Sequence, residues 1–290
     1  MRRRFLVMAR AGDTSLHRHW ISGGTRNFDL FLSCYGKDPS LHEGTAEHIR
    51  HMGSTKWPAL HDHIRAEPDL VGAYEAIWFP DDDILADAPT ISRMFEVFSL
   101  FGMALAQPAL TPESHHTHPI VLRHPAYVLR RTNFAEVMAP VMDARALALL
   151  VPTFAQAKVG WGLDYLWPVV LERAGLREAI GIIDATPVTH TRAVGGGDIY
   201  LGMNQGGESD IRNLRQLYPD VEFGTRRVVR RFAVLGGVKI ESGTSSFLAK
   251  MRARAHQWLV RRRASQTVRF DPASLSRPIP FSKAGLPGGS

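Results

Sequence analysis

The chain has 290 residues, of which 44% are hydrophobic and 22% charged, so it is expected to fold around a substantial core and is neither disordered nor fibrous. Its one cysteine excludes an internal disulfide and a cluster of thiolate ligands, so any metal is expected to be held by carboxylate, imidazole and water. The net charge of +7 is uneven, because residues 201–290 contain 16 of the 35 basic and 6 of the 28 acidic residues. This distribution does not favour a nucleic-acid-binding protein.

The apolar stretches of the sequence are too short for a membrane-spanning helix or a secretory signal. The longest, residues 98–106, is about half of the roughly 20 residues that a spanning helix needs. The N-terminal apolar run at 5–9 is shorter than the 7 or so apolar residues of a signal peptide. We therefore expect a cytoplasmic protein.

Apolar runs bounded by turn residues predict strands, and apolar residues at helical spacing predict helices. In chain order, the expected elements are strands at 5–9 and 29–35, a helix at 56–67, a strand at 74–79, a helix from 89 to 101, strands at 103–107 and 126–130, helices at 143–151 and 163–173, and a strand at 179–185. This alternation predicts an α/β domain over residues 1–205, with the first three strands parallel.

The remainder of the chain differs in composition. Residues 206–270 are expected to form a basic extension, with an amphipathic helix at 245–263, and residues 271–290 a disordered tail. The basic segment 247–263 has two interpretations. It either makes peripheral contact with the inner face of the membrane, or packs its apolar stripe on the domain and leaves its arginines in solvent.

Three adjacent carboxylates, Asp81, Asp82 and Asp83, follow the apolar strand at 74–79. Like charges this close repel, whereas a divalent cation would neutralise them. The carboxyl ends of strands are also where open α/β sheets bind ligands. We therefore predict that Asp81 and Asp83 bind Mg²⁺ or Mn²⁺ beside a diphosphate. The alternative is a solvated acidic turn that caps the next helix.

A second motif runs from Gly160 through Trp161, Gly162 and Leu163 to Asp164. The two glycines allow the backbone to approach a ligand closely, and Trp161 can stack on a sugar, so these three residues are predicted on the acceptor side. Asp164 opens a helix, where it is either an N-terminal capping residue or a general base.

Further charged residues are predicted near the donor, each with a structural alternative. His190 can supply an imidazole to a metal, and Arg192 can pair with phosphate. Arg10 and Asp13 follow the first strand and Lys56 begins a helix, so each either contacts the nucleotide or is an ordinary loop or surface residue. Histidines 115, 116 and 118 form a zinc cluster or a surface loop, or they line the acceptor side.

Taken in order, the triplet at 81–83, the motif at 160–164 and the segment Thr189 to Arg192 resemble the nucleotide-sugar glycosyltransferases of the GT-A fold. More closely, residues 4–205 are similar to the family DUF707. The resemblance implies a Rossmann-like mixed sheet flanked by helices, with the donor nucleotide near the first strand. It also implies a metal held at Asp83 with Asp81 nearby, a metal shell completed by His190, and deprotonation of the acceptor hydroxyl by Asp164.

These observations predict a metal-dependent glycosyltransferase that moves a sugar from a nucleotide-diphosphate donor to a hydroxyl of a glycan or lipid-linked acceptor, with inversion. Asp82 is expected on the donor side. A metal-dependent phosphohydrolase and a non-catalytic nucleotide- or carbohydrate-binding module remain alternatives. The absence of Gly-x-Gly-x-x-Gly and Walker motifs argues against a nicotinamide dehydrogenase or a P-loop ATPase.

Overall fold

The computed structural model describes residues 2–38, 40–125, 127–193, 206–223, 232–235 and 238–241, the last two segments by their backbone. The chain divides into a compact unit of residues 1–243 and a second unit of residues 244–290. The predicted helix at 245–263, the membrane contact at 247–263 and the predicted tail at 271–290 lie outside the described residues.

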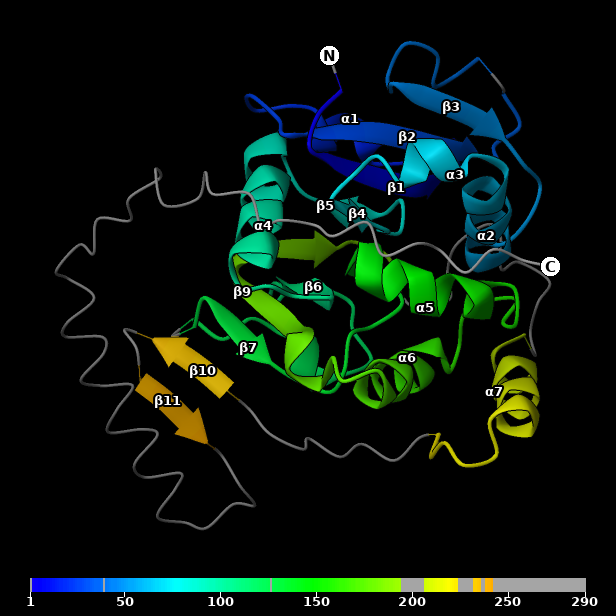
Figure 1. Ribbon diagram of the computed structural model, residues 1–290. Helices are drawn as coiled ribbons and strands as arrows, with labels where there is room; N and C mark the ends of the chain where they lie inside the picture. The colour runs from blue at the N-terminus through cyan, green and yellow to red at the C-terminus, as the bar shows by residue number, and fades with distance from the viewer. Residues whose placement is uncertain are drawn as a thin grey trace, which may run out of the picture. The chain divides into compact units, whose positions relative to one another are not determined.

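Strands and helices alternate along the compact unit (Figure 1). The strands are β1 (Phe5–Ala11), β2 (Phe28–Cys34), β3 (His48–His51), β4 (Ala76–Trp78), β5 (Ile84–Leu85), β6 (Leu105–Leu110), β7 (Leu129–Arg131), β8 (Val141–Asp143), β9 (Ile180–His190), β10 (Phe232–Leu235) and β11 (Val238–Glu241). The helices are α1 (His17–Trp20), α2 (Lys56–Ala66), α3 (Pro68–Val71), α4 (Ala88–Leu100), α5 (Ala144–Phe154), α6 (Leu163–Arg173) and α7 (Gly206–Leu217), with 3₁₀ turns η1 (Pro119–Val121) and η2 (Arg177–Ala179).

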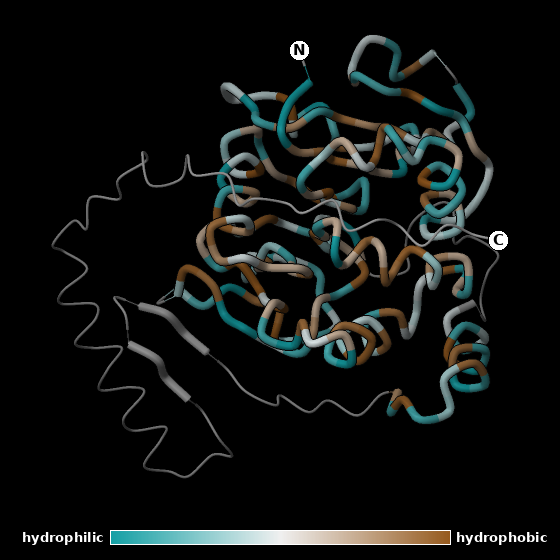
Figure 2. The backbone as a smooth tube through the Cα atoms, in the orientation of Figure 1, coloured by the Kyte–Doolittle hydropathy of each residue, from teal (hydrophilic) through white to brown (hydrophobic). Residues whose placement is uncertain are grey.

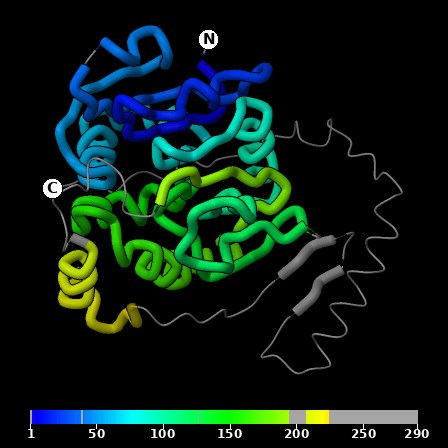
Figure 3. The backbone as a smooth tube through the Cα atoms, turned by 180° about the vertical axis from the view of Figure 1, so that it is seen from behind, coloured from blue at the N-terminus to red at the C-terminus, as the bar shows by residue number. Residues whose placement is uncertain are grey.

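The strands form one mixed sheet in the order β3-β2-β1-β4-β8-β6-β9-β7-β10-β11. The four at the N-terminal edge are parallel, as predicted for the first three apolar runs. Strand β8 is antiparallel to both of its neighbours, whereas β6 and β9 are parallel. Figure 3 shows the blue N-terminal strands at one side of the unit and the green strands at the other. The predicted Rossmann-like mixed sheet flanked by helices is confirmed.

Both faces of the sheet are covered, which explains the unbroken apolar runs of its central strands. Along β1, Phe5, Val7 and Ala9 pack with residues of α1 and α4, while Leu6 and Met8 pack with residues of α2, α5 and α6. Figure 2 shows apolar residues concentrated along these elements and polar residues in the outer loops. The sheet is therefore the shared wall of two cores, and its strand ends are where polar side chains can gather.

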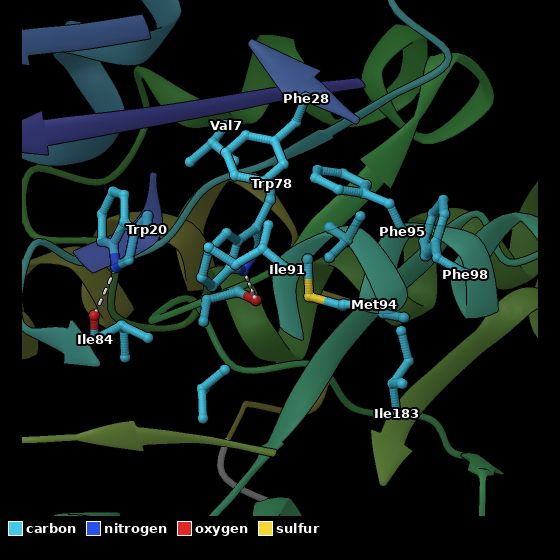
Figure 4. Close-up of a cluster of buried hydrophobic side chains, with 14 of the residues drawn as sticks. Val7, Trp20, Phe28, Trp78, Ile84, Ile91, Met94, Phe95, Phe98 and Ile183 are labelled. Atoms are coloured by element: carbon cyan, nitrogen blue, oxygen red, sulfur yellow. Dashed lines mark hydrogen bonds between the residues drawn. The ribbon is translucent and has the colours of Figure 1, made fainter. Parts of the chain in front are cut away.

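Two buried tryptophans fix the backbone next to the acidic triplet (Figure 4). The Trp20 indole Nε1–H donates to the Ile84 carbonyl at 2.7 Å, and the Trp78 Nε1–H donates to the Ala139 carbonyl at 3.0 Å. Ile84 directly follows Asp83, so the first bond holds the end of the triplet from within the core. The rigid core thereby positions the carboxylates.

Two of the predicted strands are longer in the structure than expected. Strand β6 continues through Pro108 to Leu110, and β9 runs to His190 instead of ending at residue 185. The register between them shifts after Pro108, so that Leu110 pairs with Val188. The extra length of β9 pairs with β5, which has only two residues and gave no apolar pattern. His190 consequently lies on a strand rather than in a loop.

The compact unit also extends beyond the boundary predicted at residue 205. Helix α7 is amphipathic, and its Leu214 is fully buried in the core that contains α5 and α6. Strand β10 pairs with β7 at the edge of the sheet. No helix among the described residues is long and apolar enough to cross a membrane.

Candidate functional site

Asp81, Asp83 and His190 converge at one end of the sheet. One ligand atom from each lies within 4.8 Å of the other two, and theirs is the one group of three or more such residues within the described part of the chain. Asp83 is buried, and its Oδ1 finds no hydrogen-bond partner among the described residues. The side chain of Asp81 is 34% exposed, so the group can be reached from solvent. The donor set of two carboxylates and an imidazole suits Mg²⁺ or Mn²⁺.

The pairing of β5 with β9 brings His190 to the triplet. Ile84 is the register partner of His190, and the Asp83 carbonyl accepts from the backbone N–H and the hydroxyl of Thr191 at 3.1 and 2.8 Å. His190 Nδ1 donates to the His115 carbonyl at 2.7 Å, which leaves Nε2 directed at Asp83 Oδ2, 3.3 Å away. Burial lowers the pKa of His190, but the Asp83 carboxylate outweighs it and raises the pKa overall. This orientation is typical of a metal-binding histidine.

Lys56 is the buried counter-ion of Asp81. Its Nζ donates to Asp81 Oδ1 at 2.7 Å and to the carbonyls of Val137 and Met138 at 2.9 and 3.0 Å. Burial lowers the pKa of Lys56, and the adjacent carboxylates oppose that shift. These acceptors account for its three N–H groups. The lysine expected to hold phosphate thus lies beside the site but faces Asp81, and its contact with a nucleotide stays a prediction.

Asp82 has different contacts from the other two carboxylates and organises the loop after β1. Its Oδ2 accepts from the Gly12 backbone N–H at 2.8 Å and from the Tyr35 hydroxyl at 3.1 Å. Arg192 Nη2 lies 3.7 Å from Asp82 Oδ1 and donates to the Thr14 carbonyl at 3.2 Å. Burial raises the pKa of Asp82, with Gly12 and Arg192 acting in the opposite direction. Asp82 and Arg192 therefore meet at the predicted donor side.

The other two residues predicted at the donor make contacts within the protein. The Arg10 side chain is buried and donates to Ser33 Oγ, and to the carbonyls of Met52 and Ser54, each at 2.6 Å. Asp13 is exposed and accepts from the Lys37 backbone N–H at 3.1 Å. Arg10 thus ties β1 to the segment before α2, and neither residue joins the metal group.

The predicted acceptor motif forms a tight turn before α6. Gly160 and Gly162 have φ values of +92° and +93°, and a Cβ on Gly160 would lie 2.4 Å from Trp57 Cδ1. Trp161 is 50% exposed, and its ring lies over Gly207 of α7. Both glycines are therefore required by the backbone, and the indole is available to a ligand. Trp78 and Trp167, by contrast, are fully buried.

Asp210 of α7 holds this turn in place. Its carboxylate accepts from the backbone N–H groups of Lys158, Val159 and Gly160 at 2.8, 2.8 and 3.0 Å. A single acidic residue on an amphipathic helix gives no sequence signal for such a role, so the role of Asp210 was not predicted from the sequence. The turn thus depends on a helix that lies beyond the predicted domain boundary.

Asp164 is buried at the first turn of α6, and its Oδ1 is unpartnered among the described residues. His118 Nε2 lies 3.9 Å from its other oxygen. Burial raises the pKa of Asp164 to about 7, although backbone N–H groups at the start of α6 lower it. A carboxyl with a pKa near neutrality can accept a proton from a hydroxyl, as a general base requires.

Glu136 was not predicted from the sequence, yet it belongs to the same region. Burial raises its pKa to about 8, and the charges of Asp164 and Asp81 add to the rise, while His190 opposes it. Its Oε2 has no hydrogen-bond partner in the described residues. The surrounding Ala135-Glu136-Val137 carries no local pattern that marks a site.

The three histidines of the loop after β6 do not form a metal group with one another among the described residues. His115 instead offers its carbonyl to His190, His116 Nδ1 donates to the Ser114 carbonyl at 3.0 Å, and His118 lies beside Asp164. No zinc cluster forms among them in the described residues, and two of the three support the site, so that their place on the acceptor side stays a prediction.

A model of the family described as "Protein of unknown function (DUF707)" matches residues 40–217. The chain belongs to the DUF707 family. The match spans the acidic triplet, the motif at 160–164 and His190 of this DUF707 protein, but not Arg10 or Asp13. No curated protein matches it. Among solved structures, the crystal structure of S. aureus TarS aligns with 74% of the chain at 10% identity and a TM-score of 0.46. The DUF707 chain covers 42% of that structure.

Proposed function

We propose that this DUF707 protein is a metal-dependent glycosyltransferase that moves a sugar from a nucleotide-diphosphate donor to a hydroxyl group. The observation that carries the proposal is the convergence of Asp81, Asp83 and His190 within 4.8 Å, with one buried Asp83 oxygen unpartnered among the described residues. Asp81, Asp83 and His190 would hold the metal. A divalent ion bound there would neutralise the charge that develops on the departing diphosphate.

The chain's own residues would divide the remaining work between two sides of the site. On the donor side, Asp82 and Arg192 shape the loop after β1, and the Arg192 guanidinium, whose Nη2 donates to the Thr14 carbonyl, would pair with a phosphate of the donor. On the acceptor side, Trp161 offers a flat surface to a glycan. Asp164 Oδ1 takes the proton of the acceptor hydroxyl, whose oxygen attacks the anomeric carbon from the face opposite the leaving group. We propose that the product is therefore inverted.

The proposal is tested by calorimetric titration of the full chain with nucleotide sugars in the presence and absence of Mn²⁺. We expect binding only with the metal, and its loss in Asp83→Asn. The matched control is Asp62→Asn, because the Asp62 side chain is 59% exposed on α2 and is not one of the residues assigned to the site. If the wild-type chain shows no metal-dependent binding of nucleotide sugars, the proposed enzyme activity is rejected.

A turnover assay separates transfer from hydrolysis. Consumption of the bound nucleotide sugar and release of nucleoside mono- and diphosphate are measured with and without methyl glycosides as acceptor probes. A glycosyltransferase releases diphosphate faster when an acceptor is present, whereas a phosphohydrolase works at full rate without one. Binding without turnover in either condition identifies a non-catalytic module.

A further inference from the structure

Glu136 is a buried residue, and one oxygen of its carboxyl group is left without a partner by the described residues. It is 5% exposed, and its backbone N–H donates to the side-chain oxygen of the fully buried Gln107 at 2.5 Å. Its Oε2 has no hydrogen-bond partner among the residues described. Burying a carboxyl in this way costs free energy, and folded proteins rarely leave such a group without a reason. We therefore expect the unpartnered oxygen to bind a ligand.

The segment that carries Glu136 runs from the Asp164 side of the site to the Asp81 side. At one end, the Phe134 ring lies 4.8 Å from that of His118 and 6.0 Å from that of Tyr165, the two neighbours of Asp164. At the other end, the Val137 and Met138 carbonyls accept from Lys56 Nζ, which pairs with Asp81. Glu136 stands between these ends. The effect of the Asp164 and Asp81 charges on its pKa agrees with that position.

We propose that Glu136 is a second acceptor-side carboxyl, which hydrogen-bonds to the polyhydroxylated acceptor while Asp164 deprotonates the attacking hydroxyl. This inference rests on the proposed function and deepens it. The acceptor O–H bond breaks and its proton passes to Asp164. The acceptor oxygen bonds to the anomeric carbon, and the bond from that carbon to the phosphate oxygen breaks, its electron pair leaving with the nucleoside diphosphate. Glu136 holds the acceptor in line throughout.

A second metal ion is a weaker explanation of the same two carboxyls. Glu136, Asp164 and His118 do not meet as a group of three ligands, since within the described residues only Asp81, Asp83 and His190 do. A hydroxylated ligand needs no such convergence, because two carboxyls can each bind a different hydroxyl group. The geometry thus favours an acceptor with neighbouring hydroxyls, the chemistry of a glycan.

The test compares Glu136→Gln with the matched control Glu113→Gln, whose side chain is exposed in the loop after β6. Calorimetry with Mn²⁺ and a nucleotide sugar measures donor binding, and diphosphate release with methyl glycosides measures transfer. We expect Glu136→Gln to bind the donor within about 2-fold of the wild-type chain. Its kcat/KM for the acceptor is expected to fall by about 10-fold, the equivalent of one hydrogen bond to a neutral group. The control changes neither quantity.

The double variant with Asp164→Asn identifies a shared ligand. If both carboxyls hold one acceptor, the double variant loses less than the product of the two single losses. Wild-type transfer by Glu136→Gln, or loss of donor binding together with transfer, overturns the role of Glu136 and leaves the proposed function intact. If the wild-type chain itself shows no metal-dependent donor binding, both proposals are rejected. We expect the thermal unfolding temperature of Glu136→Gln at pH 8 to equal or exceed that of the wild-type chain. Such a result excludes misfolding as the cause of a loss of transfer.

Discussion

Two buried aspartates, Asp184 and Asp83, differ in how completely the chain satisfies them. Asp184 on β9 accepts from Arg130 Nε and Nη2 at 2.8 and 2.9 Å and from the His124 backbone N–H at 2.6 Å. Asp83 has His190 Nε2 at 3.3 Å from one oxygen and, among the described residues, nothing on the other. The first carboxylate is part of the scaffold. The second is stabilised only when something outside the chain completes its shell.

The strongest test of the scaffold side removes the partner of Asp184. Arg130→Met leaves a buried carboxylate without its counter-ion, and we expect the free energy of unfolding to fall by about 3 to 5 kcal/mol, as is usual when one member of a buried ion pair is deleted. Urea unfolding measures the loss. Arg65→Met, at an exposed position on α2, is the control and is expected to cost under about 0.5 kcal/mol. If Arg130→Met lowers the free energy of unfolding by less than about 1 kcal/mol, Asp184 is not part of the scaffold.

Removal of the Asp83 carboxylate is expected to weaken metal binding but not stability. Asp83→Asn is expected to weaken Mn²⁺ binding by at least about 100-fold, more than the 10- to 100-fold that loss of an outer-shell partner costs. The unfolding free energy of the metal-free chain should stay unchanged or rise, because a repelling charge beside Asp81 is removed. Calorimetry and urea unfolding of one preparation measure both. A destabilised variant that still binds Mn²⁺ would place Asp83 with the scaffold.

The pH dependence of stability sharpens the same contrast at Asp164. Burial raises its folded-state pKa from 3.8 to about 7. The Asp164 carboxyl therefore binds a proton more tightly in the folded chain than in the unfolded chain. Its contribution to the free energy of unfolding is fully present below pH 4 and is lost as the pH rises towards 7. Relative to wild type, Asp164→Asn should be more stable at pH 8 than at pH 5 by about 2 kcal/mol. Urea unfolding at both pH values measures this, and an equal difference at each pH contradicts it.

The smallest expected effect concerns Asp210, a satisfied carboxylate near the acceptor motif. Asp210→Asn replaces one acceptor oxygen by an amino group that faces a backbone N–H, so we expect a loss of about 1 kcal/mol. Glu208→Gln on the same helix, with a side chain 79% exposed, should change stability by under about 0.5 kcal/mol. Hydrogen exchange of the Lys158 to Gly160 amides reports the effect locally. Unchanged protection of these amides in Asp210→Asn would show that the turn is stable without the Asp210 carboxylate.

The parts of the fold that the sequence predicts are those whose residues are buried on both faces. Strands β1, β2 and β4 are buried along their whole length and mostly apolar, and α4 and α6 carry apolar residues at helical spacing. Strand β3 reads His-Ile-Arg-His and is half-exposed at the sheet edge, so it has no such run. Strands β5 and β8 have two and three residues, too few for a period to be recognised.

The candidate site was predictable only where its residues are adjacent in sequence or end a strong element. The acidic triplet and the two-glycine motif are local, and the structure brings the three residues named as metal ligands together. The partners of Arg10 and Lys56 come from distant segments, so the sequence cannot tell that their N–H groups are used within the protein. Glu136 lies on an irregular segment between strands, and only the folded chain sets it beside Asp164.

The pairing of β5 with β9 makes the spacing of β9 as important as its composition. Successive side chains of a strand point to opposite faces, so a shift of one residue reverses every side chain beyond it. Ile84 is opposite His190 and Leu85 opposite Thr189, and the hydrogen bonds from Thr191 to the Asp83 carbonyl continue this alignment. Inserting or deleting one residue between 186 and 189 would turn the imidazole to the wrong side while leaving every ligand in the sequence.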